Sequence, residues 1–438
     1  PMRRRPTRKR VTLEAGVVGC ALLVAGCASV DDSAPSASSR PISTANTDVT
    51  TASAAASNAT DPIELPTTST FEPSTTAPVA EQRLDPQLEQ RLQAILDAAM
   101  PSMLTPEATL QAAVLVGSTD TSWSGAAGRD DDANRPFRMA SVGKTFTAAT
   151  TLRLVESGAF AIDDTIDGLL SAETLALLSG DGYRVSEITV EQLLVHTAGL
   201  FDYAFGEGSP MLQRALSDFG HEWTRAEQLQ LAVDVGDPVA GPGAEFHYGD
   251  TGYVLLGEII ERTTGKPYAA AMRELLGYDR LGLEQVWLEH GENAPPGAPT
   301  ISRSFFTTTE LTDLDFSIDA FGGGGLAGTG PDIARFFEAL LGGEVFDDPS
   351  TLDLMLRIPA TNMGLEEFGI PFGDGASGLY RIEIAGNTCW NHRGFLGTIA
   401  LACPAADRTV VVTTNTATTE PLAIASDLVI AMSQPRRD

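Results

Sequence analysis

Strand-like runs at both ends of the folded part of the chain restrict its possible architecture most. Two such runs, Leu110–Ser118 and Ser122–Asp131, come early, and four more lie between Leu379 and Asn415. Between them, from Gly158 to about Gly343, helical patterns alternate with Gly/Pro-rich loops. We therefore expect an α+β fold, because one antiparallel sheet built from both chain ends and flanked by helices buries these apolar faces. A mostly helical lobe would be inserted between the two halves, with a cleft between sheet and lobe.

Helical segments next to these runs support this arrangement. Asp85-Pro86 predicts a helix start, and Leu88, Leu92, Ile95 and Leu96 follow at helical spacing. Residues 145–157 and 421–434 are also predicted to be helices.

The N-terminal region has the order of features found in export signals. A basic stretch precedes a short apolar run that ends in Val24-Ala25-Gly26-Cys27. Residues 1–27 resemble a bacterial lipoprotein signal in which Cys27 is lipidated; the alternative is an ordinary secretory signal. Residues 28–83 are rich in Ser, Thr, Ala and Pro and predict a disordered tether, which leaves a single domain over residues 84–435.

Charge and cysteine content limit the partners of the chain. The formal net charge is −29, which disfavours nucleic acid as a partner. Only Cys389 and Cys403 lie outside the N-terminal region, and they flank a predicted hairpin. They are compatible with a disulfide in an oxidising compartment or with two buried free thiols.

The stretch Arg138–Thr150, RMASVGKTFTAAT, permits two interpretations. Gly143-Lys144-Thr145 could end a phosphate-binding loop, but that loop needs a glycine where Arg138 stands. The other interpretation is a Ser-x-x-Lys motif. If Ser141 opens a helix, Lys144 lies on the same face and can act on the serine oxygen, beside a helix N-terminus that favours negative charge.

Two further motifs follow in order: Tyr248-Gly249-Asp250 before an amphipathic helix, and His392-Arg393-Gly394 on a predicted strand. With LLVHTAGLFDY and GGGGLAGTGPDIARFFEALL, they resemble the penicillin-recognising serine hydrolases, from about Leu88 to Ala431. The similar branch comprises class C β-lactamases, D-alanyl-D-alanine carboxypeptidases and related esterases. The resemblance implies the β-lactamase/DD-peptidase-like fold, with the active site in the cleft between sheet and helical lobe.

The resemblance also implies roles for individual residues. Ser141 would be the nucleophile that forms an acyl-enzyme, Lys144 would activate it, and Tyr248 would shuttle a proton. His392 would lie on the strand at the edge of the cleft. The backbone N–H groups of Ser141 and Phe395 would form the oxyanion hole.

Gly394 would let the substrate approach the strand closely. The family phrase around His196 suggests a structural role for it. Neither a metal nor another cofactor is expected, since no H-E-x-x-H pattern occurs. Gly322–Gly325 is better explained as a backbone bend than as a phosphate cradle.

Two positions differ from the family pattern. Asp250 stands where the motif usually ends in Asn, so it cannot donate to a substrate carbonyl and should favour a charged Lys144. Arg393 replaces a small hydroxyl residue. It could bind a substrate carboxylate, or strand alternation could turn it away from His392 into solvent.

The sequence therefore predicts an exported serine hydrolase, first of all a D-alanyl-D-alanine carboxypeptidase-like enzyme. It would be held on the outer face of the bacterial cytoplasmic membrane by its lipid, or be secreted. The alternatives are an esterase or D-amino-acid amidase, then a β-lactamase. Small peptides, esters or β-lactams would be the substrates. A non-catalytic cell-envelope binding protein on the same fold is the alternative from another class, and the sequence leaves the oligomeric state open.

Overall fold

The computed structural model describes residues 82–103, 107–129, 132–367 and 370–433. The signal expected at residues 1–27, its Cys27, and the tether as far as residue 81 lie outside the described residues. Gln82 and Arg83, just before the predicted start of the domain at residue 84, form β1 and pair in parallel with Thr121 and Ser122. This pairing uses the backbone, so side-chain composition could not reveal it. None of the described helices has the length and apolar character that a membrane span requires.

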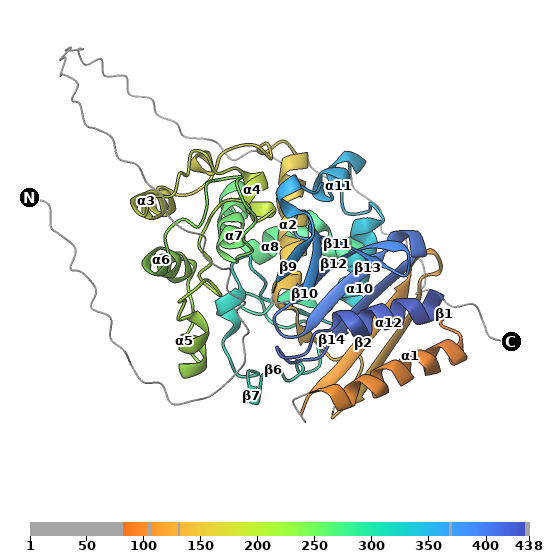
Figure 1. Cartoon of the computed structure of the whole chain (residues 1–438). Coiled ribbons are helices and arrows are strands. Elements are labelled where there is room, and N and C mark those ends of the chain that lie inside the picture. Colours follow the sequence, from red (N-terminus) through yellow and green to blue (C-terminus); the bar gives the residue numbers. More distant parts are fainter. Residues whose placement is uncertain (1–81, 104–106, 130–131, 368–369, 434–438) are drawn as a thin grey trace, which may run out of the picture. The chain divides into compact units, whose positions relative to one another are not determined.

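The main sheet has nine strands in the order β1-β3-β2-β14-β13-β12-β11-β10-β9, so strands from both chain ends meet where β2 pairs with β14 (Figure 1). Every pairing except β1 with β3 is antiparallel. The predicted α+β architecture is thereby confirmed. The strands are β1 Gln82–Arg83, β2 Thr109–Val116, β3 Thr121–Gly128, β9 Leu365–Glu367, β10 Ile370–Gly375, β11 Tyr380–Ile384, β12 Asn387–Gly394, β13 Thr398–Cys403 and β14 Arg408–Thr413.

The sequence did not predict β9 and β10, which extend the sheet beyond β11. Pro371, Gly373 and Gly375 lie in β10, and these residue types are depleted in regular strands. The pairing of β10 with β9 is irregular between Pro371 and Gly373. A strand near the sheet edge tolerates such residues because fewer ladder hydrogen bonds depend on them.

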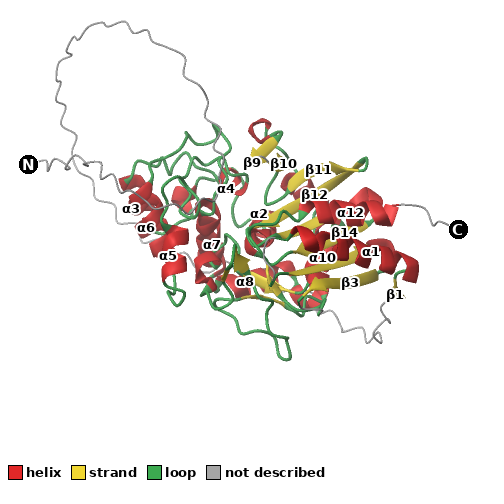
Figure 2. Ribbon diagram, turned by 60° about the horizontal axis from the view of Figure 1, so that its bottom comes forward, coloured by secondary structure: helices red, strands yellow, loops and turns green. Residues whose placement is uncertain are grey.

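Each face of the sheet is covered by its own helices (Figure 2). The predicted terminal helices, α1 (Pro86–Ala99) and α12 (Leu422–Ser433), pack on one face, where Ile399 and Leu401 of β13 point. The alternate residues Ala400 and Ala402 join the other core, which contains α10 (Gly330–Leu341) and α2 (Gly143–Glu156). Successive residues of a strand therefore lie in different cores, which matters below for β12.

The region between the two halves of the sheet is largely helical, as predicted. Its helices are α3 Ala172–Gly180, α4 Val190–Leu194, α5 Met211–Ser217, α6 Arg225–Val235, α7 Thr251–Thr264, α8 Tyr268–Leu276 and α9 Tyr278–Leu281, and α11 Pro349–Met355 follows α10. A three-stranded sheet joins β4 (Phe137–Arg138), β8 (Leu326–Gly328) and β5 (Val286–Leu288), and β6 (Phe305–Phe306) pairs with β7 (Thr309–Glu310). β4 ends three residues before Ser141, so this small sheet helps to position the start of the Ser-x-x-Lys segment.

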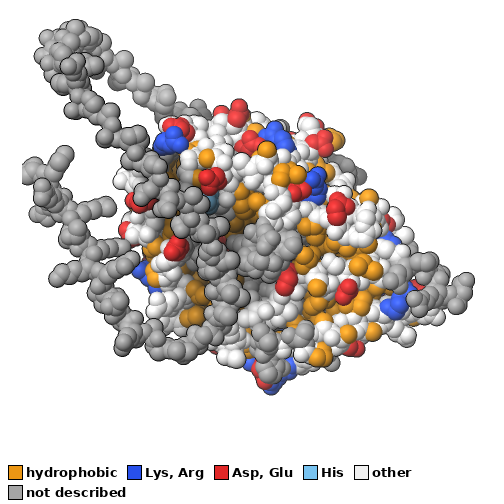
Figure 3. Space-filling model, viewed as in Figure 1, with side chains coloured by type: hydrophobic (Ala, Val, Ile, Leu, Met, Phe, Trp, Pro, Cys, Tyr) orange, Lys and Arg blue, Asp and Glu red, His pale blue; other side chains and the backbone are white. Residues whose placement is uncertain are grey.

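Acidic side chains are dispersed over the face of the molecule seen in Figure 3, with Lys and Arg side chains scattered among them. The negative charge of the chain is therefore spread over this surface and not gathered at one place.

A disulfide joins Cys389 of β12 to Cys403 of β13, so the structure has the first of the two states that the sequence left open. Both cysteines are fully buried in the core beneath α1 and α12. His392, three residues further along β12, points to the opposite face of the sheet.

We expect the Cys389→Ala/Cys403→Ala protein to lose about 3 kcal/mol of unfolding free energy, because a closed loop of this length restricts the unfolded chain. Denaturant unfolding with and without reductant measures the loss. Catalytic rates should stay near those of the unmodified protein. A midpoint that neither reduction nor substitution lowers would contradict the expectation.

Candidate active site

Ser141 lies at a tight bend between β4 and α2. It is the middle residue of a short 3-10 helix, Ala140–Val142. Helix α2 begins at Gly143, two residues before the predicted helix 145–157 and two residues after Ser141. Ala140 has a φ of 46°, which is uncommon for a residue with a side chain. Because residues three apart still share a face, Lys144 Nζ lies 3.0 Å from Ser141 Oγ and donates to it.

Lys144 is fully buried and is held by two further acceptors. Its Nζ donates to the Gly323 carbonyl at 2.6 Å and forms an ion pair with Asp250. Burial lowers the pKa of Lys144, but the charges of Asp250, Asp319 and Asp202 outweigh it, so the pKa lies above the ordinary value. The resting Lys144 is therefore an ammonium group that can stabilise negative charge on Ser141, as the aspartate in the Tyr motif led us to expect.

Two aspartates that the sequence did not single out belong to this cluster. Asp202 accepts the backbone N–H groups of Asp250, Phe205 and Ala204, at 2.9, 2.8 and 3.2 Å. Burial, with the Asp250 charge, raises the pKa of Asp202 to about 6. Asp202 stands within the family phrase that contains His196, and Asp319 stands just before the Gly322–Gly325 run, but neither position marks a site by its spacing.

The glycine run explains how Asp319 reaches the cluster. A Cβ at Gly324 would lie 2.1 Å from Asp319 Oδ2 and 2.6 Å from the Ala140 carbonyl, so only glycine fits between them. The neighbouring Gly323 supplies the carbonyl that binds Lys144. The run is a bend in the backbone, as expected, and it also supplies one of the hydrogen-bond acceptors of Lys144.

Tyr248 lies among the aromatic side chains beside Lys144. Its ring centre is 5.1 Å from Lys144 Nζ, 4.6 Å from the His196 ring and 6.4 Å from the His392 ring. The structure therefore brings together the three motifs, Ser141-x-x-Lys144, Tyr248-Gly249-Asp250 and His392-Arg393-Gly394, around one cation.

His196 lies behind Tyr248 and contacts the backbone of the Tyr motif. Its Nδ1 accepts a hydrogen bond from the Gly249 N–H at 3.4 Å, and its carbonyl accepts one from the His247 N–H at 2.8 Å. Burial, with the Lys144 charge, holds the pKa of His196 well below its usual value. A neutral ring that binds the backbone in this way fits the structural role expected for it.

His392 is fully buried on the face of β12 that contacts Tyr248. Its Nδ1 lies 2.8 Å from the Arg393 carbonyl and must donate to it, because a carbonyl only accepts. Burial, with the Lys144 charge, lowers the pKa of His392 to about 3. The ring is therefore neutral, and its Nε2, buried without a partner among the described residues, is an acceptor.

Gly394 has a different physical role from the expected one. A Cβ at Gly394 would lie 2.2 Å from the Met139 carbonyl and 3.2 Å from Ala140 Cβ. The missing side chain thus lets β12 pack against the bend that carries Ser141, and does not open space for a substrate. Phe395 follows in the turn between β12 and β13 and lines the same pocket as Ser141.

Arg393 points away from the pocket. It pairs in register with Ile399, which belongs to the core beneath α1 and α12, and its Nη1 donates to Glu420 Oε2 at 3.2 Å. The side chain is buried, so it lies neither in the pocket nor free in solvent. The expectation that Arg393 binds a substrate carboxylate is therefore wrong, because strand alternation puts His392 and Arg393 on opposite faces.

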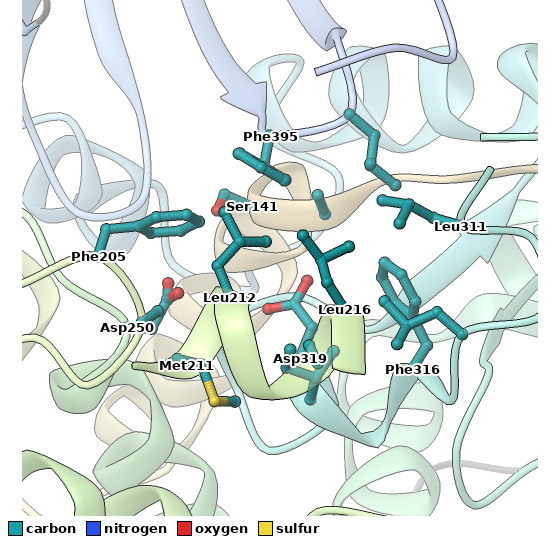
Figure 4. A pocket seen from close by; sticks show the side chains of 16 residues that line it. Ser141, Phe205, Met211, Leu212, Leu216, Asp250, Leu311, Phe316, Asp319 and Phe395 are labelled. Atoms are coloured by element: carbon teal, nitrogen blue, oxygen red, sulfur yellow. The ribbon is translucent and has the colours of Figure 1, made fainter. Parts of the chain in front are cut away.

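The pocket at Ser141 is almost entirely apolar (Figure 4). Thirteen of its sixteen lining residues are apolar. The other three are Ser141, Asp250 and Asp319. The apolar wall consists of Ala140, Ala204, Phe205, Met211, Leu212, Ala215, Leu216, Leu311, Leu314, Phe316, Ile318, Phe395 and Leu396.

Arg138, which stands where a phosphate loop would need glycine, supports one wall of this pocket. Its guanidinium pairs with Glu289 and donates to the carbonyls of Leu311, Thr312 and Leu314, at 2.6, 3.1 and 3.0 Å. It also lies 4.0 Å from the centre of the Phe316 ring. In the described part of the chain, no group of three or more His, Cys, Asp or Glu side chains is arranged to hold a metal ion.

Comparison with known proteins agrees with this geometry. The family model Beta-lactamase matches residues 98–431. A Dichelobacter nodosus protein named for fimbrial assembly, FimD of serogroup D, is 29% identical over 210 residues, 47% of this chain and 49% of that protein. The chain thus spans about half the length of this curated relative. Esterase EstB of Burkholderia gladioli is 28% identical over 278 residues, 56% of this chain and 68% of the esterase.

Among solved structures, a D-stereospecific amidohydrolase from Streptomyces sp. has the same fold. Its TM-score is 0.64 at 24% identity, with 78% of this chain and 97% of that chain covered. The family match extends over most of the domain and includes all three motifs that surround Lys144. The chain therefore belongs to the Beta-lactamase family of penicillin-recognising serine hydrolases and is a serine hydrolase.

Proposed function

We propose that this enzyme hydrolyses esters or neutral amides of small apolar acyl groups through an acyl-Ser141 intermediate. The observation that carries this proposal is the pocket in which Ser141 stands, where apolar side chains form all of the wall except Ser141, Asp250 and Asp319. Burial of apolar surface supplies most of the binding free energy in such a pocket.

The proposed reaction begins with attack of Ser141 Oγ on the acyl carbon. The Lys144 ammonium, 3.0 Å from Oγ, stabilises the charge that develops there. Tyr248 relays the serine proton to the departing alcohol or amine. The backbone N–H groups of Ser141 and Phe395 bind the carbonyl oxygen. Water then attacks the acyl-enzyme, returns a proton through Tyr248 to Ser141 and releases the acid.

The pocket gives less support to the carboxypeptidase that the sequence suggested first. A peptide with a free C-terminus, like a β-lactam, brings a carboxylate that needs a cation when it is buried. Arg393, the group expected to supply that cation, is paired with Glu420 on the other face of β12. Asp250, which lies in the pocket wall, would disfavour a second carboxylate beside it. The esterase or amidase alternative therefore becomes the leading proposal, in keeping with the likeness to EstB.

A series of p-nitrophenyl esters tests the proposal. We expect kcat/KM to rise about fourfold for each added CH₂ until the pocket is filled, because each buried methylene contributes about 0.8 kcal/mol. The butanoate ester should exceed the succinate monoester of equal length by at least about tenfold, since the latter differs mainly by its carboxylate. D-alanyl-D-alanine peptides and penicillin should be poor substrates.

Two results would contradict this proposal. Rates that do not depend on acyl length would mean that the pocket does not hold the acyl group. Rapid release of D-alanine with slow ester cleavage would restore the carboxypeptidase proposal.

Export and lipid attachment at Cys27 are a separate proposal that rests on residues 1–27. Metabolic labelling with a fatty acid tests it, and the label should be lost in Cys27→Ser.

A further inference from the structure

The charges around Lys144 do not balance if every carboxyl group is ionised. One buried ammonium faces the carboxyl groups of Asp202, Asp250 and Asp319, which would leave a net charge of −2. Such an excess in a water-poor site is strongly unfavourable, and carboxyl groups that share a site lose their protons unequally. At least one of the three groups should therefore keep a proton at neutral pH.

The hydrogen bonds indicate which carboxyl group holds it. Asp202 accepts three backbone N–H groups, and Asp250 has the ion pair with Lys144. For Asp319, the described residues supply one donor to the carboxyl group, the Gly325 N–H at 3.1 Å. Asp319 is therefore the least compensated of the three carboxyl groups.

Asp319 also lies where its charge would affect the reaction. Asp319 and Asp250 both lie beside Gly323, because a Cβ there would lie 3.1 Å from Asp319 Oδ1 and 3.3 Å from Asp250 Oδ1. Both side chains line the pocket with Ser141, and Figure 4 shows both carboxyl groups extending toward the space near the serine. A second negative charge here would oppose the negative charge that develops on the substrate oxygen.

We propose that Asp319 carries a proton in the active enzyme, and that its ionisation slows acylation of Ser141 by adding uncompensated negative charge to the Lys144 cluster. This inference rests on the proposed role of Ser141. Asp319 does not touch the reacting atoms. Its protonation state sets the net charge of the Lys144–Asp250 pair and its surroundings, so it is a positioning residue.

The surroundings of Asp319 support the proposal. Asp319 is partly exposed because it lines the pocket, yet that pocket is apolar. Burial, with the Asp250 charge, raises the pKa of Asp319 to about 7, and the Lys144 charge and the Gly325 hydrogen bond oppose this only in part. An apolar acyl group that displaces water would raise the pKa of Asp319 further.

Lys144 and two tyrosines that face Asp319 keep one protonation state from pH 6 to pH 9. Lys144 stays charged, since its pKa is raised. Tyr203 and Tyr268 also sense the Asp319 charge, and burial keeps the pKa of both phenols above the ordinary value. Asp202 has its pKa raised to about 6, so it titrates at the lower end of this range and is ionised well before pH 9.

The test is the pH dependence of kcat/KM for an apolar ester, measured with the unmodified protein and with Asp319→Asn. The protonated form is active, so the unmodified enzyme should lose at least about tenfold as pH rises from 6 to 9, with a midpoint near 7. Asp319→Asn keeps the shape and stays neutral, so its profile should lose the fall above pH 7. Asp319→Glu, which restores a carboxyl group, should recover the fall.

Exposed Asp313 on the same segment provides the matched control, because Asp313→Asn should keep the alkaline fall. A rate in the unmodified enzyme that rises steadily from pH 6 to 9 would overturn the proposal without any variant, even if Asp319→Asn failed to fold. An equal fall in Asp319→Asn would also overturn it and assign the proton to another group. Failure of the proposed acyl-Ser141 function would give a different result from failure of the Asp319 proposal. In the first case, Ser141→Ala would keep its activity at every pH.

Discussion

The Ser141→Ala protein should lose about 10³-fold or more of kcat/KM toward apolar esters and should form no covalent adduct with a fluorophosphonate. Oγ is the only group proposed to attack the acyl carbon, and removal of a nucleophile leaves only the contribution of binding and the oxyanion donors. Intact mass after reagent exposure, with initial rates, measures both effects.

Two controls make this result specific. Ser157 directly follows α2, at the end of the helix far from Ser141, and its hydroxyl donates to the Leu154 carbonyl. Ser157→Ala should therefore keep the rate and the adduct. Ser141 is only partly buried, so Ser141→Ala should unfold at nearly the same temperature as the unmodified protein. An adduct that persists in Ser141→Ala would assign the nucleophile to another residue and reject the proposed mechanism.

Replacement of Lys144 by methionine should have the largest effect on stability. The side chain is fully buried and pairs with Asp250, so Lys144→Met leaves buried carboxylates without a cation. We expect a loss of about 3–5 kcal/mol in unfolding free energy at pH 7. We also expect kcat/KM to fall about 10²- to 10³-fold, because positive charge beside Ser141 is lost. Denaturant unfolding and ester kinetics measure the two effects.

The pH dependence of that loss follows from the aspartates. Asp319 and Asp202 already have folded-state pKa values above their ordinary value, and removal of Lys144 should raise the pKa of both groups further. When the pKa of a carboxyl group is higher in the folded state than in the unfolded state, its ionisation destabilises the folded state. This loss of unfolding free energy is present at pH values above the pKa of the group in the unfolded chain. It should shrink as pH falls from 7 toward 4, and Lys144→Met should approach the unmodified protein in stability.

A second substitution separates charge from packing. Lys144→Met/Asp250→Asn removes the partner charge and should recover most of the stability without recovering the activity. The exposed Lys266, paired with Glu274, provides the control, since Lys266→Met should change stability by less than about 1 kcal/mol. Lys144→Met with unchanged stability at pH 7 would contradict the ion-pair network.

Local patterns in the sequence were sufficient for the fold class and for the order of the motifs. Strand alternation and helical spacing depend on neighbouring residues, so β2, β3 and β11–β14 were recognisable, as were the helices at either end. The chemistry of Ser141 and Lys144 could also be anticipated, because three positions along one turn bring two side chains together whatever surrounds them.

Only the tertiary structure decided what surrounds that pair. Asp202 and Asp319 come from segments far apart in the chain, and nothing in their local sequence marks them as neighbours of Lys144. The direction of Arg393 depends on which face of β12 carries the α1/α12 core, and the role of Gly394 depends on the close approach of Met139. The apolar pocket draws its residues from positions between 140 and 396. Charge balance and pocket polarity are sums over such long-range contacts, so they emerge only when the chain is folded.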